Sequence, residues 1–196
     1  ITLDGQRSAS VSTADMDAGE LTKLVERCVA MAREAPEDPY AGLAPEELLF
    51  KCPVPDLDLD DGSEADPAAL RAAAQAVEEA ARAVAGVTNS EGGSASHSRT
   101  RFALVTSHGF AGGYGLSGHS LSASVIAGEG ANMQRDYGWH SAHHLSDLES
   151  VGDIGTRAGT RAVARLNPGK APNGKAPVLF DPRVSGGIVG HLLGAI

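Results

Sequence analysis

Three histidines lie close together at positions 140, 143 and 144, and imidazole is a frequent ligand of transition metals. On a helix, all three side chains could reach one ion. On a strand, His140 and His144 would share one face and His143 would point to the other. Asp147 is the nearest carboxylate and no cysteine is close by, so the ligand set is incomplete. Two interpretations stay open: a self-sufficient metal enzyme that uses this cluster, or the polar end of a strand.

Two further patterns resemble ligand-binding motifs without meeting their requirements. Residues 113–118 fit GxGxxG, but a dinucleotide needs a helix N-terminus directly after such a loop. A segment of alternating polar and apolar residues follows instead, which predicts a glycine-rich hairpin loop at 113–118. Arg157, Arg161 and Arg165 repeat four residues apart on a predicted helix. Such a stripe favours a solvated face over an anion site.

A run of aspartates resembles a calcium-binding loop in its first half only. Asp56, Asp58 and Asp60 occupy the first, third and fifth positions of such a loop. The sixth position, which requires glycine, is Asp61, and the twelfth, which requires glutamate, is Pro67. The segment is therefore interpreted as a solvated acidic connector.

Composition excludes several classes of function. The 196 residues carry 16 basic and 25 acidic side chains, a formal charge of −9, which argues against direct nucleic-acid binding. No apolar run approaches the roughly 20 residues that span a bilayer, and no export signal is visible. Cys28 and Cys52 are too few for a disulfide framework and too far apart for a zinc ribbon. We therefore expect a cytoplasmic protein without membrane contact.

Four helices are expected from apolar periodicity and capping signals. The first follows Asp17 and stops before Pro36, and the second is capped by Asp66 with Pro67 in its first turn. Residues 37–66 between them are rich in acids and prolines and are expected to form an exposed connector with a short helical turn. The other two helices are predicted at 151–166 and 184–196.

The expected strands predict a sheet. Residues 1–13 indicate a hairpin or strand fragment, and residues 101–106 and the alternating segment 120–125 indicate strands. Met133, Arg135, Tyr137 and Trp139 would then share one face of a further strand, and residues 176–180 form a short apolar strand candidate. Short glycine-rich connections favour an antiparallel meander. The predicted fold class is α+β, an antiparallel sheet flanked by helices.

Several dispersed segments, in the same order along the chain, resemble the TldD/PmbA family, specifically its PmbA (TldE) branch. The similar segments are 86–95 (GVTNSEGGSA), 106–110 (TSHGF), 133–137 (MQRDY), 151–152, 161–162, 165–166, 175–182 (KAPVLFDP), 7–9 and 38–43. The resemblance implies that residues 1–196 form the family's N-terminal α+β domain, including the acidic connector 37–66. It also implies that a C-terminal β-rich domain of the family lies outside this chain, which would stop within the last helix.

The resemblance also implies where zinc would bind in a catalytic relative. TldD-type subunits carry an HExxxH motif on a helix, in which two histidines hold zinc and the glutamate acts as base. The corresponding positions here are Gly190, His191 and Ala195. None of them can do that work, so no catalytic, cofactor or metal residue is assigned to this chain, and zinc is expected in a TldD-type partner.

The resemblance therefore predicts a non-catalytic subunit of a cytoplasmic TldD/TldE metallopeptidase complex that acts on peptides and unfolded proteins. The partner would be a TldD-like subunit in a heterodimer, or a second copy in a homodimer. Gln134, Arg135, Asp136 and Tyr137 are the candidate contacts to partner or peptide, with an internal salt bridge and one packed aromatic as the alternative. A different class stays open, because family members are also named modulators of DNA gyrase: an interaction module without a proteolytic role.

Overall fold

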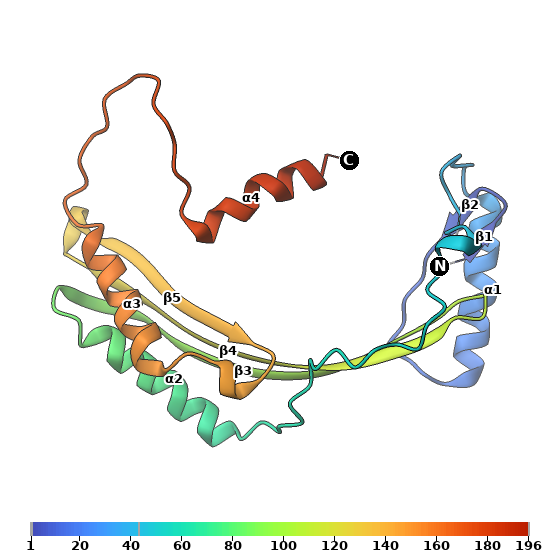
Figure 1. Cartoon of the computed structure of the whole chain (residues 1–196), viewed down its shortest axis with the longest axis horizontal. Helices are drawn as coiled ribbons and strands as arrows, with labels where there is room; N and C mark the ends of the chain where they lie inside the picture. The colour runs from blue at the N-terminus through green and yellow to red at the C-terminus, as the bar shows by residue number, and fades with distance from the viewer. Residues whose placement is uncertain (1, 43, 196) are drawn as a thin grey trace. The chain divides into compact units, whose positions relative to one another are not determined.

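The structure is a computed structural model that describes residues 2–42 and 44–195. Figure 1 shows the course of the chain. The helices are α1 (Ala18–Glu34), α2 (Pro67–Arg82), α3 (Val151–Ala164) and α4 (Pro182–Leu193), with short 3-10 turns η1 (Glu46–Leu48), η2 (Gly130–Asn132) and η3 (Leu145–Asp147). The strands are β1 (Thr2–Asp4), β2 (Arg7–Ala9), β3 (Val87–Val105), β4 (Ala111–Ala127) and β5 (Gln134–Ala142). Among the described residues, no helix is both long enough and apolar enough to cross a bilayer.

The chain divides into two compact units. The first comprises the chain up to Asp58 together with Thr100–Gly115, and the second comprises Leu59–Arg99 and the chain from Leu116 onward. In the first unit, β1 and β2 form an antiparallel hairpin that packs against α1. Cys28 is buried in this contact, and its thiol donates a hydrogen bond to the carbonyl of Ala9.

The second unit is built on a three-stranded antiparallel sheet in the order β3-β4-β5, and α2 and α3 pack together on one of its faces (Figure 1). From Ser117 onward the side chains of β4 alternate, so that odd-numbered residues are buried toward the helices and even-numbered residues, among them three serines (Ser120, Ser122 and Ser124), face the other side. The core consists almost entirely of small aliphatic residues: Val77, Ala81, Leu121, Ala123, Val125, Ala127, Ile154, Ala158 and Ala162.

Small residues let the helices approach the sheet and each other closely. A methyl group added at Gly138 of β5 would lie 2.4 Å from the carbonyl oxygen of Ile154 in α3. One added at Gly155 of α3 would lie 2.6 Å from the carbonyl oxygen of Val77 in α2. Both distances are too short for a side chain, so Gly138 sets the spacing between α3 and the sheet, and Gly155 sets the spacing between α3 and α2.

The α+β fold and its main elements confirm the sequence analysis. Asp17, Asp66, Ser150 and Asp181 cap the four helices with their side chains, as their residue types favour. The alternating segment 120–125 lies in β4 with its apolar residues buried.

Two local predictions are wrong, those at 113–118 and 176–180, and a third, the strand at 101–106, is confirmed but too short. Residues 113–118 are not a loop but part of β4, where glycine permits close strand contact: a Cβ at Gly113 would lie 2.5 Å from the carbonyl of Phe102. The strand expected at 101–106 is the end of the much longer β3, whose first half, rich in serine and glycine, has a weak strand signal. Residues 176–180 form no strand, and Leu179 is 97% exposed.

The acidic connector is exposed over most of its length but not at its end. Residues 59, 60, 61 and 63 are half-buried against the sheet of the second unit. The backbone N–H of Ser117 donates to the carbonyl of Leu59, and Arg99 forms a two-pronged ion pair with Asp60 at 2.9 to 3.0 Å. Hydrogen bonds and an ion pair therefore hold the end of the connector on the sheet, although its acidic composition alone indicates a solvated segment.

Candidate functional site

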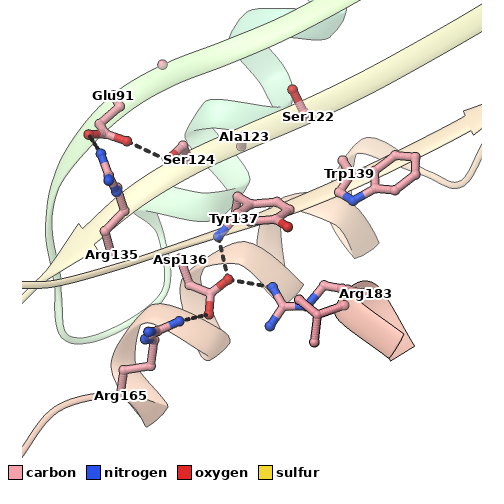
Figure 2. Close-up of a pocket in the computed structure, with 12 residues that line it drawn as sticks. Glu91, Ser122, Ala123, Ser124, Arg135, Asp136, Tyr137, Trp139, Arg165 and Arg183 are labelled. Carbon is pink, nitrogen blue, oxygen red and sulfur yellow. Dashed lines mark hydrogen bonds and ion pairs between the residues drawn. The ribbon is translucent and has the colours of Figure 1, made fainter. Parts of the chain in front are cut away.

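The residues predicted to contact a partner lie on β5, at the edge of the sheet, and divide between its two faces. Arg135 and Tyr137 are exposed on the face opposite α2 and α3, whereas Asp136 is buried and Gln134 is half-buried. A groove of about 890 Å³ runs over β4, β5 and the start of α4 (Figure 2). Its lining residues are Glu91, Gly92, Ser122, Ala123, Ser124, Arg135, Asp136, Tyr137, Trp139, Arg165, Arg183 and Val184.

Asp136 is the most buried charge in this groove, with a side chain only 4% exposed. Its two carboxylate oxygens lie 2.7 Å from Arg183 of α4 and 3.1 Å from Arg165 at the end of α3 (Figure 2). Burial opposes the ionisation of this carboxyl, but the hydrogen bonds from Arg183, the Tyr137 backbone N–H and Arg165 outweigh it. The pKa of Asp136 is therefore below its ordinary value, and the group is an anion that two arginine cations share.

A second ion pair spans the exposed face of the sheet. Arg135 lies 2.8 Å from Glu91 of β3, and the hydroxyl of Ser124 donates to the same carboxylate at 2.6 Å. The hydrogen bonds from Ser124 and Arg135 lower the pKa of Glu91, so the pair is charged at neutral pH. The arginines of this site are thus paired with carboxylates on the protein itself.

Tyr137 and Trp139 form the apolar part of the exposed face. They occupy alternate positions of β5, opposite Ser124 and Ser122, and are 43% and 49% exposed. The guanidinium of Arg183 lies 5.2 Å from the centre of the Tyr137 ring, within the range of a cation–π contact. Two large aromatic side chains beside small hydroxyls make a surface on which another chain could pack.

The outer backbone edge of β5 is occupied beside these aromatic residues. The N–H of Tyr137 donates to Asp136 at 2.7 Å, and the carbonyl of Trp139 accepts from Arg157 at 3.3 Å. Groups that are already bonded cannot pair with an added strand, and such devices protect sheet edges. Contact with a partner is therefore possible through the exposed face of β5 rather than through its edge at Tyr137 to Trp139.

The histidines that suggested a metal site do not converge. His140 accepts a hydrogen bond at Nδ1 from the N–H of Glu149, whereas the Nδ1 of His143 bonds to the carbonyl of Ser117 at 2.7 Å. Within the described part of the chain, no group of three or more potential ligands could hold a metal ion. The arginine stripe of α3 is also engaged in part, because Arg157 pairs with Glu149 at 2.6 Å and Arg165 with Asp136.

Three groups of this site escaped the sequence analysis as site residues, namely Glu91, Arg165 and Arg183. Arg165 was noted only as a member of the arginine stripe, and the signal at Arg183 is its place directly after the Asp-Pro start of α4. Asp181 caps that helix and also pairs with Arg183, which holds the guanidinium in place. The contact from Glu91 to Arg135 joins residues 44 positions apart and leaves no local pattern.

Comparison with known proteins assigns the chain to a family. A family model described as the PmbA/TldA metallopeptidase central domain matches residues 60–166, more than half of the chain. The chain belongs to the PmbA/TldD family. This match confirms the resemblance found in the sequence, and β5 with the groove residues Glu91 to Arg165 lies within the matched region.

Two curated relatives in the family are similar in sequence to nearly the whole of this chain. The chain is 38% identical to "Metalloprotease PmbA" of Escherichia coli O157:H7, over 97% of this chain and 42% of that protein. It is 32% identical to "Metalloprotease PmbA homolog" of Haemophilus influenzae, over 98% of this chain and 43% of that protein. The chain thus spans about two fifths of the length of these PmbA proteins.

Solved structures show the same fold. A candidate modulator of DNA gyrase from Bacteroides thetaiotaomicron matches with a TM-score of 0.85 and 27% identity, over 97% of this chain and 44% of that one. TldE from Thermococcus kodakarensis matches with a TM-score of 0.57 and 18% identity, over 79% of this chain and 34% of that one. At that identity, the archaeal TldE supports the fold alone.

Proposed function

We propose that this chain is part of a non-catalytic, TldE-type subunit of a metallopeptidase complex that acts on peptides and unfolded proteins. The observation that carries the proposal is the composition of α4 and its end. At the positions that the family resemblance matches to HExxxH, Gly190 has no side chain, His191 stands in place of the glutamate, and Ala195 offers only a methyl group. These residues do not fit a zinc ion, so the metal and the catalytic base would come from a TldD-type partner.

The groove supports a role in contact with that partner or with a peptide. Arg135 and Tyr137, together with Trp139, present one charged and two aromatic groups on the exposed face, a combination enriched at interfaces. Asp136 has a different part in the proposal: its carboxylate is engaged with two arginines of its own chain and positions the start of α4. Gln134 is half-buried at the start of β5 and would lie at the rim of the contact.

The test is to mix the full-length gene product with its HExxxH-bearing homologue from the same genome and to measure mass by light scattering after size exclusion. We expect a one-to-one complex with peptidase activity that a zinc chelator abolishes. The product of this gene alone should be inactive and contain no stoichiometric zinc. Separate elution, or zinc-dependent activity of the single protein, would overturn the proposal.

The name of one relative suggests a second candidate function, and the same experiment distinguishes it from the first. Because a structural relative is described as a candidate modulator of DNA gyrase, a purely regulatory protein would bind its target without a protease partner. In that case the mixture would show no complex, whereas gyrase added in place of the homologue would co-elute. The cytoplasm is the location we propose for the complex, because both cysteines of this chain are free thiols.

A further inference from the structure

A cavity of about 500 Å³ lies in the second unit, on the helix-facing side of the sheet, and shares no lining residue with the groove. It is bounded by β3 and β4, by α2 and the start of α3, and by residues 63–66 and 145–150. Half of its lining residues are aliphatic: Ala65, Ala69, Leu70, Ala73, Ala95, Leu121, Leu145, Leu148 and Val151. Small-molecule sites have volumes of about 300–1,000 Å³ and combine apolar walls with a few polar groups, as this cavity does. The proposed function uses no part of it.

Asp61 holds three sides of this cavity together. Its carboxylate is only 12% exposed and accepts hydrogen bonds at 2.9 Å from Nε2 of His119 and from the backbone N–H of Leu145. It also accepts from the backbone N–H and the hydroxyl of Ser63. His119, Leu145 and Ser63 all line the cavity and come from β4, the segment after β5 and the end of the acidic connector. One buried carboxylate therefore keeps the cavity in shape without a ligand.

The charged side chains that line the cavity, among the described residues, are all acidic, namely Glu64, Asp66 and Glu149. Glu149 pairs with Arg157 at 2.6 Å. Glu64 is exposed and has no hydrogen bond or ion pair within residues 2–42 and 44–195, although Arg99 attracts it from beyond ion-pair distance. A cleft lined by one sign of charge concentrates ions of the opposite sign. The charge of this cavity therefore favours a cation.

The helix starts beside the cavity do not make it an anion site. A helix start attracts anions through its free N–H groups and its dipole. In α2, however, the carboxylate of Asp66 accepts from the N–H of Ala68 at 2.9 Å, and in α3 the hydroxyl of Ser150 accepts from the N–H of Asp153 at 3.1 Å. Asp66 and Asp153 also place a negative charge at each start. Both helices are therefore provided with their own caps and acidic groups.

From these walls and charges we infer that the cavity is a binding site for a small primary amine with an apolar body. The apolar body would be buried among aliphatic side chains such as Leu70, Leu121 and Val151, which line the cavity from α2, β4 and α3. The ammonium group would pair with Glu64, whose charge has no partner at ion-pair distance, and would lie in the field of Asp66. This site is separate from the groove, and its existence does not depend on the proposed function.

A titration of the full chain with 2-phenylethylamine, followed by NMR, tests the site. The uncharged analogue is 2-phenylethanol and the anionic analogue is 3-phenylpropanoate. The amide signals of Ala73, Ala95 and Leu121 report on binding, because these residues line the cavity. We expect the amine to shift them saturably and to bind at least about tenfold more tightly than either analogue, since only the ammonium can donate charged hydrogen bonds to carboxylates. No saturable shift of these signals, or equal or tighter binding of an analogue, overturns the inference.

Two pairs of variants locate the bound amine. Ala73→Leu fills the cavity and should abolish binding, whereas Ala72→Leu, at an exposed position of α2 outside the lining, should keep it. Glu64→Gln should weaken the binding of the amine about threefold, as for an exposed ion pair, and leave that of the alcohol unchanged. Glu79→Gln, at an exposed glutamate of α2 outside the lining, should change neither. If Ala73→Leu does not fold, the glutamate pair decides. Wild-type affinity for the amine in folded Ala73→Leu or in Glu64→Gln overturns the inference.

Discussion

The carboxylate of Asp136 on β5 lies 2.7 Å from the guanidinium of Arg183 in the first turn of α4. None of the residues Pro182–Leu193 is buried. The ion pair, together with the contact of Arg183 with the Tyr137 ring, attaches the first turn of this helix to the sheet. Under the proposed function, this is the helix that corresponds to the one expected to carry the zinc motif in a TldD-type subunit, and Arg183 fastens its start to the sheet.

Asp136→Asn should destabilise the protein and loosen α4. The neutral amide leaves Arg165 and Arg183 without their shared carboxylate. Loss of one partner from a buried charge cluster destabilises a protein by several kcal/mol, and because both arginines here are partly exposed we expect about 2 kcal/mol. Urea unfolding at pH 7 measures this loss, and hydrogen exchange should show faster exchange in residues 182–193. Glu129→Gln, at an exposed site, is the control and should change the free energy of unfolding by less than about 0.5 kcal/mol. Equal stability of the two variants would contradict the proposed attachment.

Stability should fall on acidification, in part through the same residue. The pKa of Asp136 is lower in the folded protein than the ordinary value of about 3.9 in an unfolded chain, so the unfolded state binds more protons in acid. Its contribution is fully present above that ordinary value and is lost as the pH falls through the folded value. Unfolding free energies at pH 6, 4.5 and 3.5 should decrease in the wild type and decrease less steeply in Asp136→Asn. Parallel curves would show that Asp136 does not contribute to the acid sensitivity.

Gly138→Ala should be much more damaging than an alanine substitution at a nearby glycine. Its methyl group would lie 2.4 Å from the carbonyl of Ile154, so α3 must move away from β5, a cost of about 1–3 kcal/mol. Gly152→Ala is the matched control, because a Cβ there lies 3.7 Å from its nearest neighbour and the residue is helical. That change should leave stability unchanged or raise it by up to about 1 kcal/mol. Thermal unfolding monitored by circular dichroism distinguishes the two, and similar melting temperatures would refute the close packing.

Local patterns were sufficient for the helices and for the class of the fold. Caps such as Asp66 before Pro67, and the strict alternation around Leu121, are signals carried by neighbouring residues, and the structure places both as expected. The loop predicted at 113–118 was wrong because a glycine in a strand and a glycine in a loop look alike in sequence. The two are distinguished only by a contact with a distant segment, here the close approach of Phe102 to Gly113.

The sites depend on contacts between distant segments, which one sequence does not reveal. Asp136 was singled out with its neighbours, but its partners Arg165 and Arg183 come from two different helices 29 and 47 positions away. Asp61 and His119 are 58 positions apart, and Asp61 alone read as one more member of a solvated acidic run. Conversely, His140, His143 and His144 are close in sequence but do not converge, because β5 ends at Ala142, between the first of them and the other two.

Trp139 provides a direct test of the exposed face of β5 as the contact surface. It is the only tryptophan in the chain, is 49% exposed, and lies beside Tyr137 in the groove, so in this chain its fluorescence reports on this site alone. If the HExxxH-bearing homologue, in a variant without tryptophan, covers this face, the emission should shift to the blue on mixing.

Trp139→Ser and Arg135→Ala should weaken the complex by about 1 kcal/mol or more each, as aromatic and arginine contacts at interfaces do. Arg135→Ala should alter the free energy of unfolding by less than about 0.5 kcal/mol, because its side chain is exposed. The stability of Trp139→Ser is measured alongside, since about half of that side chain is covered. Glu129→Gln, outside the groove, should leave binding unchanged, and full-strength binding by both groove variants would place the partner on another surface.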